Sequence, residues 1–471
     1  MFVTQAIAHW ARTNPNQLAI LTKERVITYA SFHKAICSAI SSLDEVLRGD
    51  KTTKVAVWIN SPAESLVVTL SLMHLGYQPH LINASVGQFG KEYGFAFCIT
   101  DQKRNIHGVA DILVSPDWFD RNSEFTSPAK NPGATFYSSG STGKPKPTLK
   151  TFEGSPSPIG HFIYSSAFVP YRKRLVLMGV ISTFGFHNIY ESFIAGQTTC
   201  FTPDITLAPF LINIHDIDFI VCSVQQCAAL VKEIEANPIP SGKIQAVMLG
   251  GSKIPPTLLT KVRERLCRKV MSSYGATEAG TPALATDLIE IEHIEDAVGY
   301  ILPWANLEIV DEADCPVANG LRGIVRYYIP KSPLEEYAAS RDIPWYYPGD
   351  IGSIVNGSVL CIHGRVDHVM NIGGVKFSAE DIDFELSKID ICEEVAVTTR
   401  ESSEGHDLLS IFVVSHHEKS LVEARIELQL ETLSIKSLPF SIHFIDKLPR
   451  SSEGKLLRGR LLESAEPRPA R

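Results

Sequence analysis

The chain has 471 residues and a mass of 51.9 kDa, which corresponds to roughly three folding units at about 150 residues per domain. Hydrophobic residues make up 44% and charged residues 20% of the chain, and this composition excludes a mainly disordered protein. The net charge of −8 gives no support to a nucleic-acid-binding protein. No segment approaches the ~18 apolar residues that would span a membrane.

The N-terminus and the cysteines indicate the cellular compartment. The first residues lack a basic segment followed by an apolar run, so a secretory signal is not expected. The nine cysteines are odd in number and scattered, which is typical of reduced thiols that are mostly buried. We therefore expect a cytoplasmic protein.

Helix and strand patterns alternate in the first 300 residues. Apolar residues recur at three- and four-residue steps over 32–47, which predicts an amphipathic helix, and 54–60 has the pattern of a buried strand. Ser61 to Glu64 resemble a capping box with proline at the first helical position, so a second helix should begin here and end before Gly76. Further strands are predicted at 134–137, 175–180, 218–224, 246–249 and 269–273. Strands that alternate with helices favour an α/β fold with layered, mainly parallel sheets.

The pattern changes after about residue 300. Short strands separated by turns predict a β-rich subdomain, with strands at 298–303, 307–310 and 323–328. From Gly364 onward the chain has the pattern of a separate α+β unit of about a hundred residues, within the usual domain range. We therefore expect an N-terminal core over 1–363, a hinge over 364–368 and a small mobile C-terminal domain over 369–471.

The segment from Tyr137 to Lys146 gives the clearest chemical signal. It reads Tyr-Ser-Ser-Gly-Ser-Thr-Gly-Lys-Pro-Lys. Glycines let the backbone approach an anion, and backbone N–H groups together with hydroxyls can surround phosphate oxygens. The pattern is not a Walker A loop, and a flexible surface turn is the alternative. The candidate phosphate-binding residues are Ser138, Ser139, Gly140, Ser141, Thr142, Gly143, Lys144 and Lys146.

This run resembles the phosphate loop of the adenylate-forming enzymes, which include acyl-CoA synthetases, adenylation domains of peptide synthetases, and luciferases. Four further segments resemble motifs of that family and follow in the family's order. They are Ser-Tyr-Gly-Ala-Thr-Glu at 273–278, Tyr-Pro-Gly-Asp at 347–350, Gly-Arg-Val-Asp at 364–367, and Leu-Pro-Arg-Ser-Ser-Glu-Gly-Lys-Leu-Leu-Arg at 448–458. The resemblance implies a large α/β core with a small mobile α+β lid.

The resemblance also implies a site for ATP and Mg²⁺. Tyr274 would stack on adenine, Thr277 would contact the α-phosphate, and Glu278 would hold the metal, although a helix cap is the alternative for the last two. Asp350 would accept hydrogen bonds from the ribose hydroxyls, as a carboxylate can, and Arg365 would also reach the ribose. The other residues implied around the nucleotide are Gly250, Gly251, Ser252, Ser273, Gly275 and Ala276.

The C-terminal motifs are implied to serve two half-reactions. In the first, a carboxylate attacks the α-phosphorus of ATP, which gives an acyl-adenylate and pyrophosphate, and Lys455 is the implied catalytic lysine. Positive charge offsets the repulsion between the two anions. The lid would then rotate about Asp367, and Gly373 and Gly374 would help to form a tunnel for a pantetheine thiol that accepts the acyl group as a thioester.

A helix predicted over 185–195 and closed by Gly196 corresponds to one wall of the family's acyl pocket. Peptide-synthetase domains carry an Asp near its start that pairs with an α-ammonium group. Thr183 stands here, and because an unpaired buried charge is costly, an α-amino acid is disfavoured. An aromatic or medium apolar acid is favoured, with packing of the rings in the core as the alternative. The candidate pocket residues are Ser182, Thr183, Phe184, Gly185, Phe186, His187, Gly251, Gly275 and Gly280.

Three interpretations of the function remain open. The leading one is an AMP-forming acid–thiol ligase with coenzyme A as acceptor, since the chain shows no carrier domain. The second is an acyl-AMP ligase that loads the phosphopantetheine of a separate acyl carrier protein. The third is a non-catalytic adenylate-binding protein, which the retention of Glu278, Asp350, Arg365 and Lys455 disfavours. Pro147 replaces the family's Gly after the loop, and because proline removes an N–H we expect a local change there.

Overall fold

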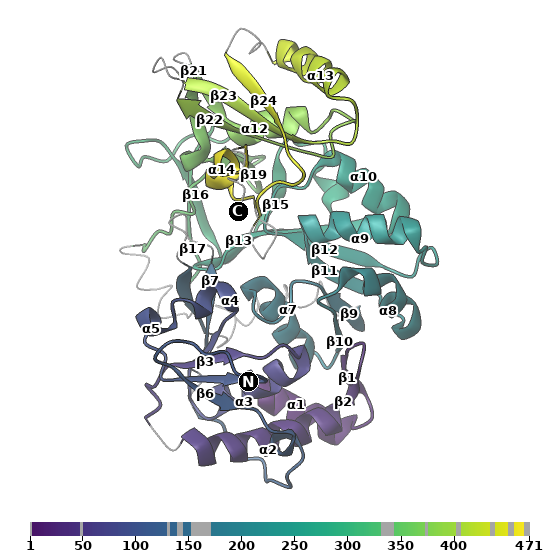
Figure 1. The fold of residues 1–471 in the computed structure, drawn as a ribbon, viewed down its shortest axis with the longest axis vertical. Helices are drawn as coiled ribbons and strands as arrows, with labels where there is room; N and C mark the ends of the chain where they lie inside the picture. Colours follow the sequence, from purple (N-terminus) through teal and green to yellow (C-terminus); the bar gives the residue numbers. More distant parts are fainter. Residues whose placement is uncertain are drawn as a thin grey trace, which may run out of the picture.

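The computed structural model describes residues 2–47, 50–129, 132–138, 145–151, 171–330, 343–372, 375–401, 407–433, 439–450 and 456–465. We call the described residues up to Arg365 the body and those from Val369 onward the cap. Figure 1 shows the cap at one end of the molecule and the N-terminal helices at the other. The α/β class with a small α+β C-terminal unit is confirmed.

The first sheet forms the N-terminal side of the body. In the described part of the chain its six strands follow the order β6 (Ala110–Leu113), β5 (Phe97–Thr100), β3 (Val55–Trp58), β4 (Pro79–Leu81), β7 (Ala134–Ser138) and β8 (Lys146–Lys150). Its neighbours pair in parallel, except for the antiparallel pair of β7 and β8. This sheet therefore places the predicted phosphate loop at one of its edges.

Local signals predict the helices beside this sheet well. In α3 (Pro62–His74), the Ser61 side chain accepts a hydrogen bond from the backbone N–H of Glu64, and proline occupies the first turn. Gly76 follows with a φ of +86°, a conformation that favours glycine. The earlier helix, α2 (Tyr29–Leu47), begins three residues before the predicted start and ends where predicted.

The larger sheet crosses the whole body. Its parallel part contains β1 (Leu18–Leu21), β10 (Thr198–Phe201), β9 (Lys173–Val176), β11 (Phe219–Ser223), β12 (Ala246–Gly250) and β13 (Lys269–Ala276), with β2 (Val26–Thr28) antiparallel at the edge. The strand predicted at 175–180 begins and ends earlier than expected, as β9. The central strands β11 and β12 are buried along their whole length and have nearly continuous apolar sequences, as expected for parallel strands that are covered on both faces.

The expected β-rich region has a hydrophobic core of its own, which contains Ile309, Val325 and Leu360, and its strands continue the larger sheet. β14 (Gly280–Ala285) folds back antiparallel on β13, and the same sheet continues through β15 (Ala297–Ile301), β19 (Val359–Arg365), β18 (Asp350–Val355), β17 (Gly323–Tyr328) and β16 (Asn306–Val310). The antiparallel strands therefore continue the parallel part of the sheet through the pairing of β13 with β14.

Aromatic side chains fix α7 (Thr183–Ile194) between the two sheets. Phe193 of α7 packs on Phe32 of α2, with ring centroids 5.0 Å apart. Phe186 of α7 meets Phe136 of β7 edge to face at 5.4 Å. Buried aromatic rings contribute large apolar areas to a core, so these contacts hold the first sheet against the helix that was predicted to line the acyl pocket.

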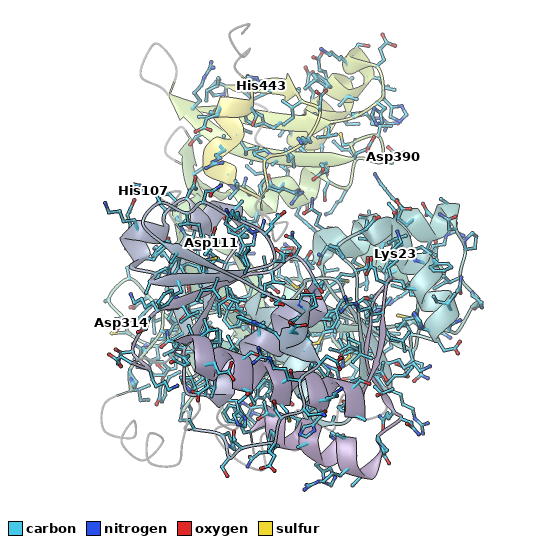
Figure 2. All side chains as sticks on the ribbon, turned by 60° about the horizontal axis from the view of Figure 1, so that its bottom comes forward. Lys23, His107, Asp111, Asp314, Asp390 and His443 are labelled. Carbon is cyan, nitrogen blue, oxygen red and sulfur yellow. The ribbon has the colours of Figure 1, made fainter. Side chains whose placement is uncertain are left out.

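The cap has a hydrophobic core of its own. Its sheet joins β22 (Glu394–Glu401), β23 (Asp407–Val414) and β24 (Phe440–Phe444), and α12 (Ala379–Leu386) and α13 (Lys419–Thr432) supply Leu386 and Ile426 to the core. Figure 2 labels Asp390 and His443 in this unit. The short 3-10 turn Val366–His368 lies between body and cap, and the cap begins with the hairpin of β20 (Val369–Ile372) and β21 (Val375–Ser378).

Two expectations about the whole chain can be compared with the structure. All nine cysteines are unpaired, and all but Cys315 and Cys392 are buried, as predicted. In the part of the chain that the structure describes, no helix combines the length and the apolar character needed to cross a membrane.

The first prediction concerns the end of α7, where Gly196 has a φ of +68° and a Cβ would lie 2.5 Å from the Trp10 ring. Gly196→Ala should lower the free energy of unfolding by about 2–4 kcal/mol, from the left-handed backbone and from overpacking together. Gly242→Ala is the matched control, since Gly242 has a φ of +77° with nothing within 4 Å. It should lose only ~1 kcal/mol. If urea unfolding showed the same loss of free energy of unfolding in both variants, the Trp10 ring would have moved aside without an energetic penalty.

Candidate active site

Three of the predicted motifs meet at one carboxylate. Asp350 begins β18 and lies opposite Arg365 of β19 in the strand register. The hydroxyl of Tyr274, on β13, donates a hydrogen bond to Asp350 Oδ2, and Arg365 Nη1 donates to Oδ1 at 3.2 Å. The structure therefore brings together the residues predicted to bind the adenine and the ribose.

Burial controls the protonation of this cluster. Burial, followed by the negative charge of Asp350, raises the pKa of Tyr274, so its hydroxyl stays protonated and remains a donor. Burial also raises the pKa of Asp350, while Tyr274 and Arg365 oppose that shift. Each carboxylate oxygen has two lone pairs, so Asp350 can still accept hydrogen bonds from ribose hydroxyls.

The turn between β13 and β14 carries the residues predicted to contact the α-phosphate and the metal. A Cβ at Gly275 would lie 2.3 Å from the carbonyl oxygen of Gly280, so only glycine fits this close approach. The backbone N–H of Ala276 donates to the hydroxyl of Tyr327 at 3.1 Å, and that hydroxyl donates to the carbonyl of Gly280 at 3.3 Å. Thr277 lies in the same turn. The geometry of the turn therefore depends on Tyr327, which the sequence analysis did not identify.

A hydrogen-bond donor lies beside the Glu278 carboxylate. The hydroxyl of Tyr346 donates to Glu278 Oε2 at 3.3 Å. Burial and then the negative charge of Glu278 raise the pKa of Tyr346 to about 12, so Tyr346 remains a donor. No cluster of three or more His, Cys, Asp or Glu side chains within the described ranges could enclose a metal by itself. A single carboxylate fits Mg²⁺ that is shared with nucleotide phosphates, the usual arrangement for this ion.

The predicted wall of the acyl pocket lies against the end of β12. α7 begins at Thr183, two residues before the predicted start, and the Ser182 hydroxyl caps it by accepting a hydrogen bond from the N–H of Gly185 at 2.9 Å. A Cβ at Gly250 would lie 3.2 Å from the Phe184 ring and 3.2 Å from the carbonyl oxygen of Ser273. The start of α7 and the ends of β12 and β13 are therefore in close contact.

The aromatic residues of this wall differ in burial. Phe186 is 1% exposed and packs in the core, so the alternative of core packing describes this residue. Phe184 and His187 are partly exposed. Gly251 has a φ of +91° and Gly280 also a φ of +91°, a region in which glycine carries no penalty. Ser252 is exposed in the loop after Gly251. The acyl-binding role of these residues stays a prediction.

The phosphate loop is framed by described strands but itself lies mostly outside the described residues. Ser138 of β7 pairs with Lys146 of β8, so the loop connects the two ends of an antiparallel pair. The predicted loop residues outside the described part are Ser139, Gly140, Ser141, Thr142, Gly143 and Lys144. Pro147 lies in β8, the last strand in the sheet order, and proline is tolerated in edge strands.

Two side chains that the sequence analysis did not identify support the base of this loop. His80 of β4 forms a hydrogen bond between Nδ1 and the Tyr137 hydroxyl at 2.9 Å. Tyr93 of α5 (Gly90–Tyr93) donates its hydroxyl to the carbonyl of Pro145. Burial, and then the charge of Lys54, lower the pKa of His80 to about 4, so its imidazole is neutral near pH 7. The two contacts hold the chain just before and just after the loop.

The predicted catalytic lysine, Lys455, and the tunnel glycines, Gly373 and Gly374, lie outside the described residues. The arginine of the same motif is described. Arg458 Nη2 donates to Asp383 Oδ2 on α12 at 2.5 Å, and its side chain is 9% exposed. Asp367, the predicted pivot, accepts a hydrogen bond from Arg365 Nε at 2.9 Å.

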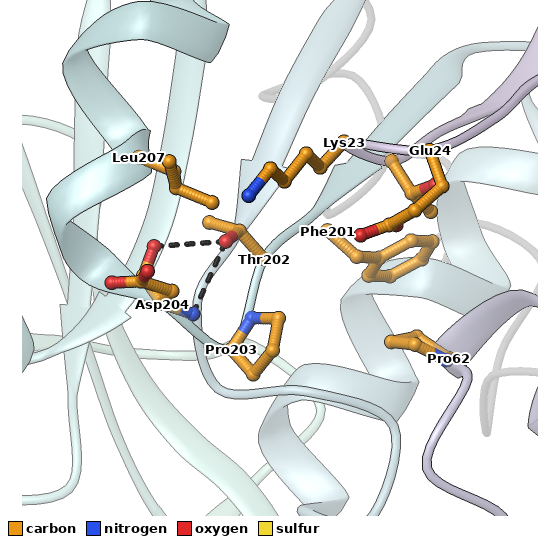
Figure 3. Close-up of a pocket in the computed structure, with 9 residues that line it drawn as sticks. Lys23, Glu24, Pro62, Phe201, Thr202, Pro203, Asp204 and Leu207 are labelled. Atoms are coloured by element: carbon orange, nitrogen blue, oxygen red, sulfur yellow. Dashed lines mark hydrogen bonds between the residues drawn. The ribbon is translucent and has the colours of Figure 1, made fainter.

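A pocket of about 200 Å³ lies away from these motifs. Figure 3 shows Lys23 extending toward Thr202, whose hydroxyl donates to the backbone carbonyl of Asp204 at 2.8 Å. None of the residues that line this pocket belongs to the predicted site, so the pocket provides no support for the nucleotide or acyl roles.

Comparisons with known proteins identify the family. Residues 7–327 match the family of AMP-binding enzymes. The chain is 24% identical to the 2-succinylbenzoate–CoA ligase of Bacillus subtilis (strain 168), over 96% of this chain and 96% of the relative. The o-succinylbenzoate coenzyme A synthetase of Bacillus subtilis in complex with ATP and magnesium has the same fold, with 20% identity, 97% and 99% coverage of the two chains and a TM-score of 0.79. A double mutant of that synthetase, bound with its product analogue, gives a TM-score of 0.65 at 20% identity, with 97% and 98% coverage.

The site and the fold thus define an adenylate-forming enzyme. The matched region spans more than half of the chain, so the chain belongs to the AMP-binding enzyme family, as the five motifs indicated.

The second prediction tests the support of the phosphate loop. Tyr93→Phe removes one hydroxyl and leaves the Pro145 carbonyl without that donor. The KM for ATP in pyrophosphate exchange should rise about three- to tenfold, the range for one lost hydrogen bond, and the KM for the acid should change less. Tyr300→Phe is the control, since Tyr300 is 37% exposed on β15. An unchanged KM for ATP would contradict a role for Tyr93 in positioning the loop.

Proposed function

We propose that the protein is an AMP-forming acid–thiol ligase, which converts a small carboxylic acid to an acyl-adenylate with ATP and then to a thioester of coenzyme A. One observation carries this proposal. The Tyr274 hydroxyl and the Arg365 guanidinium converge on the Asp350 carboxylate, whose side chain is 13% exposed, so residues of three separate motifs form one polar site suited to a nucleoside.

In the first step, an oxygen of the substrate carboxylate forms a bond to the α-phosphorus of ATP and pyrophosphate leaves. Mg²⁺ bound at Glu278 would supply positive charge that offsets the repulsion between the two anions. Asp350 and Arg365 orient the ribose, and Lys455 places a cation beside the reacting oxygens. Positioning matters because little covalent chemistry is left to the protein in such transfers.

In the second step, the thiol sulfur attacks the acyl carbonyl carbon, the thiol proton is lost and AMP leaves. We propose that the cap turns between the two steps, with body, hinge and cap divided at 1–363, 364–368 and 369–471. Gly364 supports this division, because a Cβ there would lie 2.4 Å from Ser378 Oγ of the next segment. The 3-10 turn Val366–His368 follows directly after β19.

We infer that the substrate is an aromatic or medium apolar acid. Thr183 offers no charge to an α-ammonium group, and Phe184 presents its ring beside Gly250. A relative that matches nearly the whole chain is a 2-succinylbenzoate–CoA ligase, which favours coenzyme A over an acyl carrier protein as acceptor. The reduced, mostly buried cysteines support a cytoplasmic location.

The third prediction is that the purified protein catalyses carboxylate-dependent exchange between ATP and pyrophosphate with Mg²⁺. The acids to compare are 2-succinylbenzoate, hydroxybenzoates, medium-chain fatty acids and α-amino acids. We expect exchange with an aromatic or apolar acid and none with α-amino acids, because Thr183 offers no charge to a buried ammonium. Asp350→Asn should reduce exchange strongly. If none of these acids supported exchange while the protein was folded, the proposed function would be refuted.

The fourth prediction separates the half-reactions. Lys455→Ala should abolish pyrophosphate exchange, because the cation beside the reacting oxygens is lost. The same variant should still convert a supplied acyl-adenylate to the thioester with coenzyme A. Lys447→Ala, which changes another lysine of the same region, is the control. Equal loss of both half-reactions in Lys455→Ala would show that the lysine does not act in one step only.

A further inference from the structure

Lys253 connects the body to the cap. It follows the Gly250–Ser252 turn, and its ammonium forms an ion pair with Asp296 Oδ1 at 2.5 Å. The same ammonium lies 4.3 Å from the centroid of the Phe384 ring on α12 of the cap. The Lys253 side chain is 31% exposed, so both contacts are partly shielded from water, and a cation–π contact is stronger when it is desolvated.

The body end of this connection is rigid. Asp296 is 4% exposed and accepts a hydrogen bond from His363 Nδ1 at 2.9 Å. His363 lies on β19, and its Nε2 contacts the Ser353 hydroxyl of β18 at 2.9 Å. Burial alone would raise the pKa of Asp296, but hydrogen bonds from His363 and Lys253 lower it below its usual value. Asp296 is therefore ionised near pH 7 and keeps the ammonium in place.

Two further contacts between body and cap are ion pairs in which the body also supplies the cation. Arg322 of the body lies 3.6 Å from Asp381 of the cap, and Lys232 of the body lies 3.5 Å from Glu393 of the cap. In each of the three contacts the cation belongs to the body. The Arg322 and Lys232 side chains are 55% and 73% exposed, and exposed pairs are weak and screened by salt. Of these three contacts, the one made by Lys253 is the most shielded from water.

Solved structures of one related enzyme match this chain to different degrees. The Bacillus subtilis synthetase gives a TM-score of 0.79 with ATP and magnesium and 0.65 with its product analogue, at nearly equal coverage. Taken over the whole chain, this structure is therefore more similar to the ATP-bound one than to the double mutant with the product analogue.

We propose that Lys253 and Phe384 form a latch that holds the cap in the arrangement for acyl-adenylate formation and that opens before the thioester step. This proposal rests on the proposed function. Lys253 stays with Asp296 when the cap turns, so Phe384 leaves the ammonium. Both are positioning residues, since they set the balance between two arrangements and touch neither the nucleotide nor the acid.

Phe384→Leu tests the latch, because it keeps an apolar side chain on α12 but removes the π face. Lys388→Met is the matched control. The Lys388 ammonium lies 4.7 Å from the centroid of the same ring but belongs to the cap, so this change removes a cation–π contact that does not cross the interface. Lys253→Met removes the latch from the body side, and the double variant of Lys253 and Phe384 shows whether the two act together.

The first measurement is the distance between spin labels on body and cap. Cys315 is exposed in the body, and Ala424→Cys adds an exposed site on α13, in a background with Cys392→Ser. With ATP and Mg²⁺ bound, the ratio of the ATP-like to the alternative arrangement should fall about three- to tenfold in Phe384→Leu. Lys253→Met should give a similar shift, the double variant no further shift, and Lys388→Met none.

The second measurement compares the half-reactions. The rate of pyrophosphate exchange should fall in Phe384→Leu in proportion to the decrease in the population of the ATP-like arrangement. The rate of thioester formation from a supplied acyl-adenylate should be undiminished. Distances identical to those of the unmodified chain, or an equal shift in Lys388→Met, would overturn the latch. If the distances shift as expected but no acid supports exchange, the proposed function fails and the latch stands.

Discussion

The largely buried carboxylate of Asp350 is the constraint on which the site depends. A buried charge is costly unless it is paired and hydrogen-bonded, and Tyr274 and Arg365 supply both partners. Because Arg365 lies opposite Asp350 in the β18–β19 register, the pairing of two strands also sets the geometry of the nucleoside site. The chain leaves the sheet at Val366, so the connection to the cap begins where this constraint ends.

Local sequence signals predicted the elements that depend on local physics. The Ser61 cap and the strand at 323–328 agree with α3 and β17, because a capping residue and a short run of β-branched and aromatic residues are both encoded within a few positions. The continuation of the β-rich strands from β13 was not predicted. It depends on pairings between segments about sixty residues apart, such as β15 with β19, and short apolar runs carry no information about strand order.

The supporting residues of the site had no signal that sequence reasoning could detect. Tyr93, Tyr327 and His80 belong to none of the recognised motifs, and each could equally be a residue that only packs against its neighbours. Their polar atoms reach Pro145, Ala276 and Tyr137 only in the folded chain. Motif residues could be recognised because they recur in a fixed order along the chain, whereas a hydroxyl that supports a loop from another element has no fixed spacing to it.

Helix α12 contacts both the arginine of the C-terminal motif and basic residues of the body. Glu380 and Asp383 are three residues apart and share one face of the helix, and both contact Arg458. Asp381 and Phe384 are also three residues apart and contact the body through Arg322 and Lys253. Arg458 is three residues from Lys455, a span of at most ~11 Å. Because the helix moves as a unit, a displacement that separates Phe384 from Lys253 would also draw the Lys455 segment away from the body.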